Sequence, residues 1–231
     1  MDSPDPVSHA SPGSPVRTVR SRLASVARTA QLWLWAAAAG AVAAGATISF
    51  RWLIEQVERL ATGHAGGLVD AARSLAPWHR WAVGAVGGLL AGLVLELGLR
   101  WAARGPAGEF HVDYIDAARQ GQVVLNDRTT LARSASALLS VGTGASIGRE
   151  GPMVQMAAWL ASWIARFSPL PVEQRNAILV CGIAAGIGSV YHAPIAGVVF
   201  VLELALGFFA RHTVAPVLIA SATSSGLIYW L

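Results

Sequence analysis

The sequence predicts an all-α, polytopic membrane protein whose helices are broken and tilted. Of its 231 residues 54% are hydrophobic and only 13% are charged, and the mean hydropathy is +0.51, whereas a soluble domain averages about 25% charged residues. The apolar residues form long runs, but glycine or proline interrupts several of them before they reach the roughly 20 residues that cross a bilayer. Interrupted helices are tolerated at membrane depth only where they face protein or a water-filled cavity. The pattern is therefore typical of a channel or transporter with discontinuous helices.

Charge and cysteine content exclude several function classes. Lys and Arg together number 17 and every one is Arg, yet they are scattered along the chain and the net charge is only +4. A nucleic-acid-binding domain gathers its basic residues into a patch or stripe, so no nucleic acid is expected as a partner. Cys181 is the single cysteine, which excludes an intrachain disulfide and a multi-cysteine metal site. We expect Cys181 to be a packing residue, and we expect no metal and no cofactor.

Two short regions precede the apolar body. Residues 1–15 are rich in Ser, Pro and Asp, which predicts a disordered cytoplasmic tail, and no apolar segment of a signal peptide follows them. Residues 16–30 alternate Arg with small apolar residues, which predicts an amphipathic helix lying on the membrane lipid. The four Arg residues of this segment place the N-terminus in the cytoplasm by the positive-inside rule. We therefore expect an integral, multi-pass membrane protein.

The apolar body is predicted to hold helices of unequal length. Trp78 and Trp81 lie where an interfacial aromatic belt is expected. Gly84, Gly88 and Gly92 recur every four residues and predict a face that packs closely against a neighbouring helix. The predicted helices cover residues 32–60, 77–101, 113–120, 131–140, 151–167, 173–191, 195–209 and 214–231.

One stretch near the middle of the chain places a charged pair, Arg149 and Glu150, between two apolar segments. An ionised side chain at the centre of a bilayer costs about 2.5–3.5 kcal/mol or more, so the pair requires a partner or a function. Gly148 and Gly151 allow a tight turn, and Pro152 suits a first helical turn because it needs no amide hydrogen. The amides of Arg149, Glu150 and Gly151 then meet at the positive end of a helix, where anions bind. Glu150 is predicted to be a tethered anion, and so a gate that a free anion displaces or a proton neutralises.

Two other interpretations of this stretch stay open. In the first, Arg149 and Glu150 form a structural ion pair, although sequence neighbours rarely face each other on a helix. In the second, residues 144–148 read Gly-Ala-Ser-Ile-Gly and match the Gly-x-Ser-x-Gly nucleophile elbow, with Ser146 as nucleophile and His192 as base of an intramembrane serine hydrolase. That elbow follows a strand, and an apolar helix is predicted here instead. We therefore expect a protein that is not an enzyme.

Three segments also carry a family resemblance. Residues 148–152 read Gly-Arg-Glu-Gly-Pro and lead to Val154 and Gln155, residues 182–186 read Gly-Ile-Ala-Ala-Gly, and residues 192–203 read His-Ala-Pro-Ile-Ala-Gly-Val-Val-Phe-Val-Leu-Glu. In this order and spacing they resemble the CLC family of chloride channels and chloride/proton exchangers. The resemblance covers roughly residues 30–231 and implies that 31–231 form the first of two inverted repeats, with the C-terminal repeat absent from this chain.

The resemblance also implies site residues and partners. Glu150 is expected to be the gating glutamate, and the backbone amides of Gly148, Arg149, Glu150 and Gly151 are expected to bind the anion at the helix that Pro152 starts. Chloride or another small anion is the implied substrate. The implied assembly is a homodimer with one pore in each subunit, in the plasma membrane of a bacterium.

Three departures from the family pattern shape the expected function. The early Gly-Ser-Gly-Ile-Pro loop of the family is not found, and the matching region offers Gly108, Glu109 and Phe110 as the central-site loop. Exchangers of the family carry two adjacent glutamates where this chain has Glu203 and Leu204, which favours a voltage-gated chloride channel-like protein over a chloride/proton antiporter. The chain stops after the first repeat, so we expect a fragment. A non-conducting half that only folds or dimerises is the alternative of another class.

Overall fold

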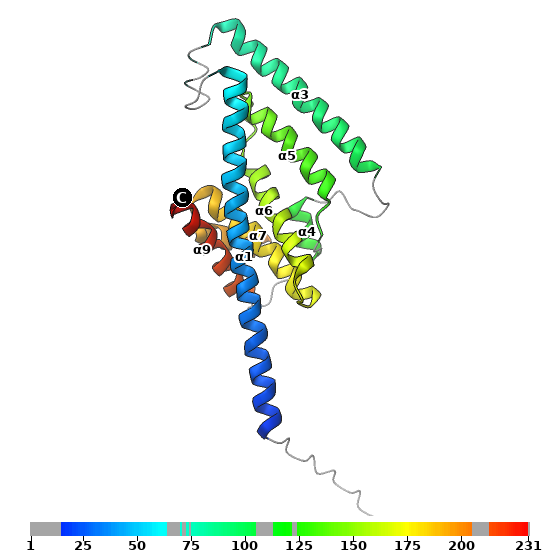
Figure 1. Cartoon of the computed structure of the whole chain (residues 1–231), viewed down its shortest axis with the longest axis vertical. Helices are drawn as coiled ribbons and strands as arrows, with labels where there is room; N and C mark the ends of the chain where they lie inside the picture. The colour runs from blue at the N-terminus through cyan, green and yellow to red at the C-terminus, as the bar shows by residue number, and fades with distance from the viewer. Residues whose placement is uncertain are drawn as a thin grey trace, which may run out of the picture.

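The computed structural model describes residues 15–63, 70, 73, 75–104, 113–121, 124–204 and 213–230, with side chains described from Thr29 onward. All regular structure in these ranges is helical, which confirms the predicted all-α class. In Figure 1 one long helix crosses the whole molecule, and the others gather along its C-terminal part. The described helices are α1 (Pro15–Thr62), α3 (Pro77–Ala103), α4 (Tyr114–Gln120), α5 (Asp127–Gly142), α6 (Glu150–Phe167), α7 (Val172–Tyr191), α8 (Pro194–Leu204) and α9 (Val214–Trp230).

The first helix, α1, is a single helix of 48 residues, so the predicted break between a surface helix over 16–30 and a spanning helix from Leu32 is wrong. No Gly or Pro stands between Val16 and Gln31, and Ala, Leu and Arg favour helix, so nothing there ends it. At 1.5 Å per residue α1 is roughly 72 Å long, more than twice the ~30 Å hydrocarbon core of a bilayer. Contact of residues 16–30 with lipid stays a prediction. The predicted tail lies outside the described residues except for Pro15, which starts α1.

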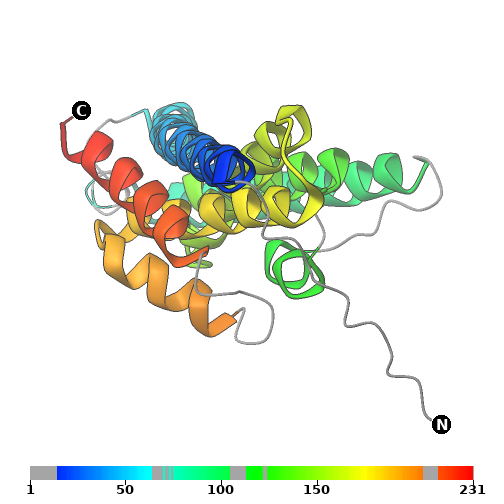
Figure 2. The same cartoon turned by 90° about the horizontal axis from the view of Figure 1, so that it is seen from below.

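The core lies where α6, α7 and α9 pack against α1. In α7 every residue from Ala177 to Ser189 is buried, and Figure 2 shows this helix lying between α1 and α8. Small residues allow the close approach of α6, because a Cβ on Gly182 would overlap Ala161 and a Cβ on Gly186 would lie 2.9 Å from the Cβ of Ala157. Cys181 is fully buried here, as expected of a packing residue.

Buried hydroxyl groups tie the core helices together. Thr47 of α1 and Ser189 of α7 share a hydrogen bond of 2.8 Å. Ser221 of α9 donates to the carbonyl oxygens of Ala184, at 3.2 Å, and Pro194, at 2.8 Å. An unpaired hydroxyl in such surroundings costs about 1–3 kcal/mol, so these bonds hold the helices in one register.

The packing of α3 is much looser. It contacts α5 through Gly87 and Gly98, where an added Cβ would overlap Thr143 and Ala132, and it runs along the outside of the molecule in Figure 1. The α3 glycine face, formed by Gly84, Gly88 and Gly92, has no described atom within 4 Å of an added Cβ. The prediction that this face packs against a helix is therefore wrong for the described part of the chain. The periodic pattern is real, but the contact with α5 falls on another side of the helix.

Two described helices are long and apolar enough to cross a membrane, namely Thr29–Thr62 within α1 and the whole of α3. The apolar helices Pro194–Glu203 and Val214–Trp230 are shorter. Long apolar helices and shorter ones therefore both occur among the described residues, and membrane spanning itself stays a prediction.

An acidic side chain at the start of α5 holds the end of α6 beside it. The Asp127 carboxylate accepts from the indole N–H groups of Trp159, at 2.6 Å, and Trp163, at 3.0 Å. Because the first residue of α5 thus meets the second half of α6, the two helices run antiparallel. The loop that joins them lies at their other end, and this loop carries the charged pair.

Candidate functional site

The loop of residues 143–149 joins α5 to α6. Thr143 caps α5 by donating from its hydroxyl to the carbonyl oxygen of Leu139 at 2.8 Å. Gly148 has a φ of +78°, a left-handed conformation that favours glycine. The helix begins at Glu150, and Pro152 lies in its first turn, where the missing amide hydrogen breaks no helical bond. The predicted turn is found at Gly148, whereas Gly151, which was predicted to share it, lies within α6. The predicted helix start in front of Pro152 is found.

The Glu150 side chain turns back over this loop. A Cβ built on Gly148 would lie only 2.8 Å from Oε2 of Glu150. The backbone angle thus favours glycine at position 148, and a larger residue would also displace the Glu150 carboxylate from its place. The carboxylate therefore lies beside the first turn of α6, at the positive end of the helix.

Unpaired backbone donors are found at the same helix start. The first helical bond of α6 runs from the amide of Met153 to the carbonyl oxygen of Arg149, at 3.4 Å, and no described side chain caps the helix. The amides of Glu150 and Gly151 form no hydrogen bond with any other described residue. Such amides are the groups with which a helix start binds anions. Binding of an anion by Gly148, Arg149, Glu150 and Gly151 stays a prediction.

Arginine side chains add positive charge around the loop. No ion pair within 4.0 Å joins Arg149 to Glu150 or to another described carboxylate, so the alternative of a structural ion pair is wrong. Arg51 of α1 donates from Nη2 to the carbonyl oxygen of Val190 at 3.2 Å, and it is near enough to Arg149 for the two charges to repel. Sequence reasoning did not predict that Arg51 would lie near this loop. The only signal was its place directly after an apolar run.

The serine hydrolase interpretation has no support in the geometry. Helix α5 precedes Ser146 where the elbow needs a strand, and Ser146 and His192 share no hydrogen bond among the described residues. His192 has another role. It caps α7 in the left-handed conformation, with φ +53°, and the amide of Ala193 donates to the carbonyl oxygen of Gly188 at 3.1 Å. This conformation favours glycine and asparagine and admits histidine.

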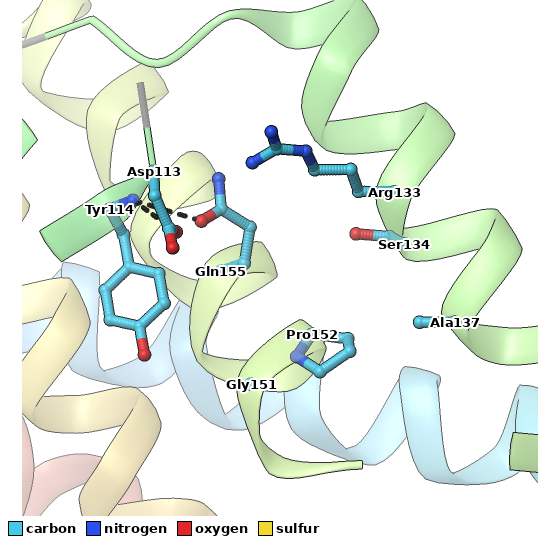
Figure 3. A pocket seen from close by; sticks show the side chains of 8 residues that line it. All are labelled: Asp113, Tyr114, Arg133, Ser134, Ala137, Gly151, Pro152 and Gln155. Carbon is cyan, nitrogen blue, oxygen red and sulfur yellow. Dashed lines mark hydrogen bonds between the residues drawn. The ribbon is translucent and has the colours of Figure 1, made fainter. Parts of the chain in front are cut away.

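A cavity of about 310 Å³ opens beside the first turn of α6, between α4 and α5 (Figure 3). Gln155 holds its walls together, because Oε1 accepts from the amide of Tyr114 at 3.2 Å and Nε2 donates to the hydroxyl of Thr130 at 3.1 Å. Sequence reasoning assigned no role to this cavity, because its walls come from three segments distant in the chain. Its lining residues are Asp113, Tyr114, Arg133, Ser134, Ala137, Gly151, Pro152 and Gln155.

The structure describes only some of the other predicted site residues. Gly108, Glu109 and Phe110 lie outside the described residues, so their place at a central site stays a prediction. Glu203 is exposed on α8, and the side chain of Leu204 is not among those described. No group of three or more His, Cys, Asp or Glu side chains that could hold a metal occurs in the described ranges.

Comparisons with known proteins relate this chain to chloride channels. Residues 87–231 match the family model described as voltage gated chloride channel. A putative chloride channel protein, ClcB-like, from Ralstonia nicotianae is 45% identical over 193 residues, which cover 82% of this chain and 44% of the relative. The voltage-gated ClC-type chloride channel ClcB of Yersinia pseudotuberculosis is 40% identical over 159 residues, covering 69% of this chain and 38% of that protein.

A third relative, the protein of that name from Escherichia coli O139:H28, is 36% identical over 194 residues, which cover 83% of this chain and 45% of that protein. The chain therefore spans less than half the length of these relatives. The family match covers well over half of this chain and includes the Gly148–Pro152 loop, α6, α7 and α8. The chain belongs to the CLC family of voltage-gated chloride channels, a family of membrane transport proteins.

Proposed function

We propose that this protein contributes to chloride transport across a membrane, in the manner of a voltage-gated chloride channel whose gate is Glu150. The observation that carries the proposal is the Glu150 carboxylate, which lies over Gly148 at a helix start whose amides at positions 150 and 151 have no described partner. The names of the relatives, which describe chloride channels, support the choice of anion.

The gate works by competition for one site. The carboxylate of Glu150 lies where a free anion would bind, so the path is closed while the side chain stays there. An arriving anion displaces it, or a proton neutralises it and weakens its attraction to the positive helix end. The guanidinium groups of Arg51 and Arg149 favour the approach of an anion by their charge.

A channel is proposed rather than a chloride/proton antiporter. Antiport needs a second group that carries protons, and Leu204 stands where the exchangers of the family have their second glutamate. A leucine side chain binds no proton. Glu203 precedes it and is exposed on α8.

The pore itself is proposed to need a second repeat. This chain spans 44% of the Ralstonia relative, and it is proposed to supply the first of two inverted repeats. The α3 glycine face, which has no described neighbour within 4 Å, supports an arrangement in which further protein covers it. The complete protein is proposed to be a homodimer in the bacterial plasma membrane, with a cytoplasmic N-terminus and with lipid around α1 and α3.

Chloride efflux from liposomes tests this proposal. The 231-residue chain is compared with a chimera in which the C-terminal part of the Ralstonia relative follows Leu231. We expect specific efflux from the chimera alone, faster at low pH. Glu150→Gln, which removes the charge, is expected to give fast efflux that no longer depends on pH. Glu173→Gln is the matched control, because Glu173 also lies in the first turn of a helix. Unchanged efflux and pH dependence in Glu150→Gln would contradict the gate.

A further inference from the structure

The end of α3 and the start of α5 bring arginine and tryptophan side chains together. The guanidinium carbon of Arg128 lies 4.8 Å from the centroid of the Trp101 ring, and its Nη1 donates to the carbonyl oxygen of Trp101 at 3.3 Å. The backbone amide of Arg104 donates to the same oxygen at 3.3 Å. Arg104 and Arg128 are therefore neighbours at the end of α3, and the contact with the ring holds the Arg128 guanidinium in place.

The two arginines have no acidic partner among the described residues. Neither Arg104 nor Arg128 forms an ion pair within 4.0 Å with a described carboxylate. A guanidinium carries five N–H donors, and the bond to Trp101 is the one that Arg128 forms with the described residues. An anion at this corner would therefore meet two guanidinium groups whose charge no carboxylate neutralises.

The acidic side chains closest in sequence already have basic partners. Glu96 accepts from Arg100 at 2.8 Å, and Asp127 pairs with Arg166 at 3.4 Å. Each of these pairs is neutral as a whole. The corner between α3 and α5 thus keeps a net positive charge.

Exposed apolar side chains continue from this corner along both helices. Leu97 lies one turn before Trp101 and Leu131 lies three residues after Arg128, so each shares a helix face with a member of the contact. Leu97 is 55% exposed, Trp101 50% and Leu131 42%. Leu97 also follows Gly88 by nine residues, or two and a half helical turns. This apolar surface is therefore on the side of α3 opposite the α3 glycine face, which we propose further protein covers.

The length of α3 places the corner at the surface of the proposed membrane. The exposed rings of Trp81 and Trp101 are 20 positions apart, which is roughly 30 Å along a helix and matches the hydrocarbon core of a bilayer. In Figure 1 α3 runs from the end of α1 back toward the other end of the molecule. With the N-terminus proposed in the cytoplasm, the end of α3 meets the cytoplasmic leaflet, whose anionic lipids attract basic side chains.

We propose that this corner is a binding site for one anionic phospholipid, whose phosphate lies between Arg104 and Arg128. Guanidinium groups bind phosphate through paired hydrogen bonds, and the Trp101 ring suits the level of the headgroups. The acyl chains lie along Leu97 and Leu131. This inference rests on the proposed crossing of a membrane by α3, and it does not depend on the gate.

The charge at the corner favours an anionic lipid over a zwitterionic one. Phosphatidylcholine also carries a phosphate, but its choline group brings a positive charge close to two arginines. Phosphatidylglycerol has no such group, so its negative charge is fully available to Arg104 and Arg128. Because exposed leucines adjoin the arginines, a lipid also fits this surface better than free inorganic phosphate, which has no apolar part.

Native mass spectrometry of the 231-residue chain in detergent tests the site, because it counts bound lipid molecules. Dioleoyl-phosphatidylglycerol is expected to bind at a several-fold lower concentration than dioleoyl-phosphatidylcholine. Arg104→Gln and Arg128→Gln are each expected to weaken binding of phosphatidylglycerol about fivefold, the effect of one basic residue at an anionic surface. Phosphatidylcholine is expected to bind both variants as it binds the wild type. Unchanged binding of phosphatidylglycerol, or an equal loss of both lipids, would overturn the proposal.

A loss of binding in Arg128→Gln could also follow from a weakened end of α3, since this side chain bonds the carbonyl oxygen of Trp101. Arg104→Gln removes no described side-chain bond, so its effect reports binding alone. Arg128→Lys keeps the charge and is expected to retain more affinity than Arg128→Gln. Melting temperatures in the same detergent check that the variants fold. If affinity follows the melting temperature and not the charge, the proposal is overturned.

Glu96→Gln tests the sign of the ligand. It removes the carboxylate that pairs with Arg100 and so adds one uncompensated positive charge close to the site. Phosphatidylglycerol is expected to bind several-fold more tightly. Unchanged or weaker binding would contradict an anionic headgroup. Inorganic phosphate in excess is expected to leave the bound lipid in place, and its displacement by phosphate would overturn the choice of a lipid.

Arg80→Gln is the matched control at the other end of α3. Arg80 lines a cavity together with Trp81, and its guanidinium also donates to backbone carbonyl oxygens, those of Leu75 at 3.0 Å and Arg73 at 3.1 Å. This variant is expected to bind phosphatidylglycerol as the wild type does. An equal loss in Arg80→Gln and Arg128→Gln would show a general attraction of anionic lipid to arginine and would overturn a defined site.

Glu150→Gln separates the lipid site from the gate. This variant is expected to bind phosphatidylglycerol as the wild type does, whereas failure of the gate would appear as unchanged efflux. Loss of the preference for phosphatidylglycerol in Glu150→Gln would contradict a site at the end of α3.

Discussion

Helix α6 is closely packed where it meets α7, whereas its start leaves open space. Where α6 meets α7, a methyl group added to Gly182 would overlap Ala161, and the contact is entirely buried. At its start, the same helix has two amides without a partner among the described residues, a carboxylate turned back on a glycine, and a cavity lined in part by polar side chains. We therefore expect α6 to contribute to stability along its packed part and to anion binding at its start. Substitutions in the packed part are expected to affect folding, and those at the start are expected to affect anion binding.

The largest effect is expected at Gly182. Gly182→Leu forces a side chain into the contact between α6 and α7, and overpacking of this kind is expected to cost about 3 kcal/mol. Thermal unfolding in detergent, followed by circular dichroism, measures it. Gly45→Ala is the control, because no described atom lies within 4 Å of an added Cβ there, and alanine in a helix interior stabilises by about 0.5–1 kcal/mol. Equal melting temperatures for both variants would contradict the close packing.

A smaller loss of stability is expected at Gln155, which lies between the packed part and the polar start. Gln155→Met keeps the size of the side chain but removes its bonds to the Tyr114 amide and the Thr130 hydroxyl. The Tyr114 amide keeps its bond to the Asp113 carboxylate at 2.7 Å, so only the Thr130 hydroxyl loses its partner, and the expected cost is about 1–2 kcal/mol. Hydrogen exchange of residues 114–120 should increase while exchange in α7 stays slow. Faster exchange in both helices would show that the two parts of α6 are not separate.

At the polar start, Gly148→Ala is expected to change function more than stability. The left-handed φ of +78° costs alanine about 1–2 kcal/mol, and the new Cβ displaces the Glu150 carboxylate. Efflux from the chimera should then depend less on pH. Gly144→Ala imposes the same type of strain, with φ +108°, and is expected to leave the pH dependence intact. An equal response of efflux to both variants would contradict the contact between Gly148 and Glu150.

The smallest effect is expected at His192, which ends α7. His192→Asn suits the left-handed cap and should change the free energy of unfolding by less than about 0.5 kcal/mol, whereas His192→Val, with a branched Cβ, should cost about 1–2 kcal/mol. Melting temperatures of the two variants measure the difference. Equal melting temperatures for His192→Val and His192→Asn would show that the left-handed cap does not explain the histidine at position 192.

The features that were predicted correctly from the sequence depend on the backbone conformations that single residues allow. The turn at Gly148 and the helix start before Pro152 follow from the conformations those two residues allow, and both are confirmed. The contact between Arg51 and Val190 joins residues 139 positions apart, and no local pattern indicates it. The α3 glycine face is a second example. The spacing of its glycines defines one side of the helix but does not indicate which element packs against that side. The uninterrupted α1 shows that a change in composition alone does not end a helix.

Occupancy of the α6 start is the most direct test of the central claim, that Glu150 competes with an anion for one site. Crystals of the wild type and of Glu150→Ala are soaked in bromide, and anomalous density is compared beside the amides of Glu150 and Gly151. We expect a bromide peak in Glu150→Ala where the carboxylate oxygens lie in the wild type, and no peak there in the wild type. A loop that keeps its shape in Glu150→Ala but binds no bromide would contradict it.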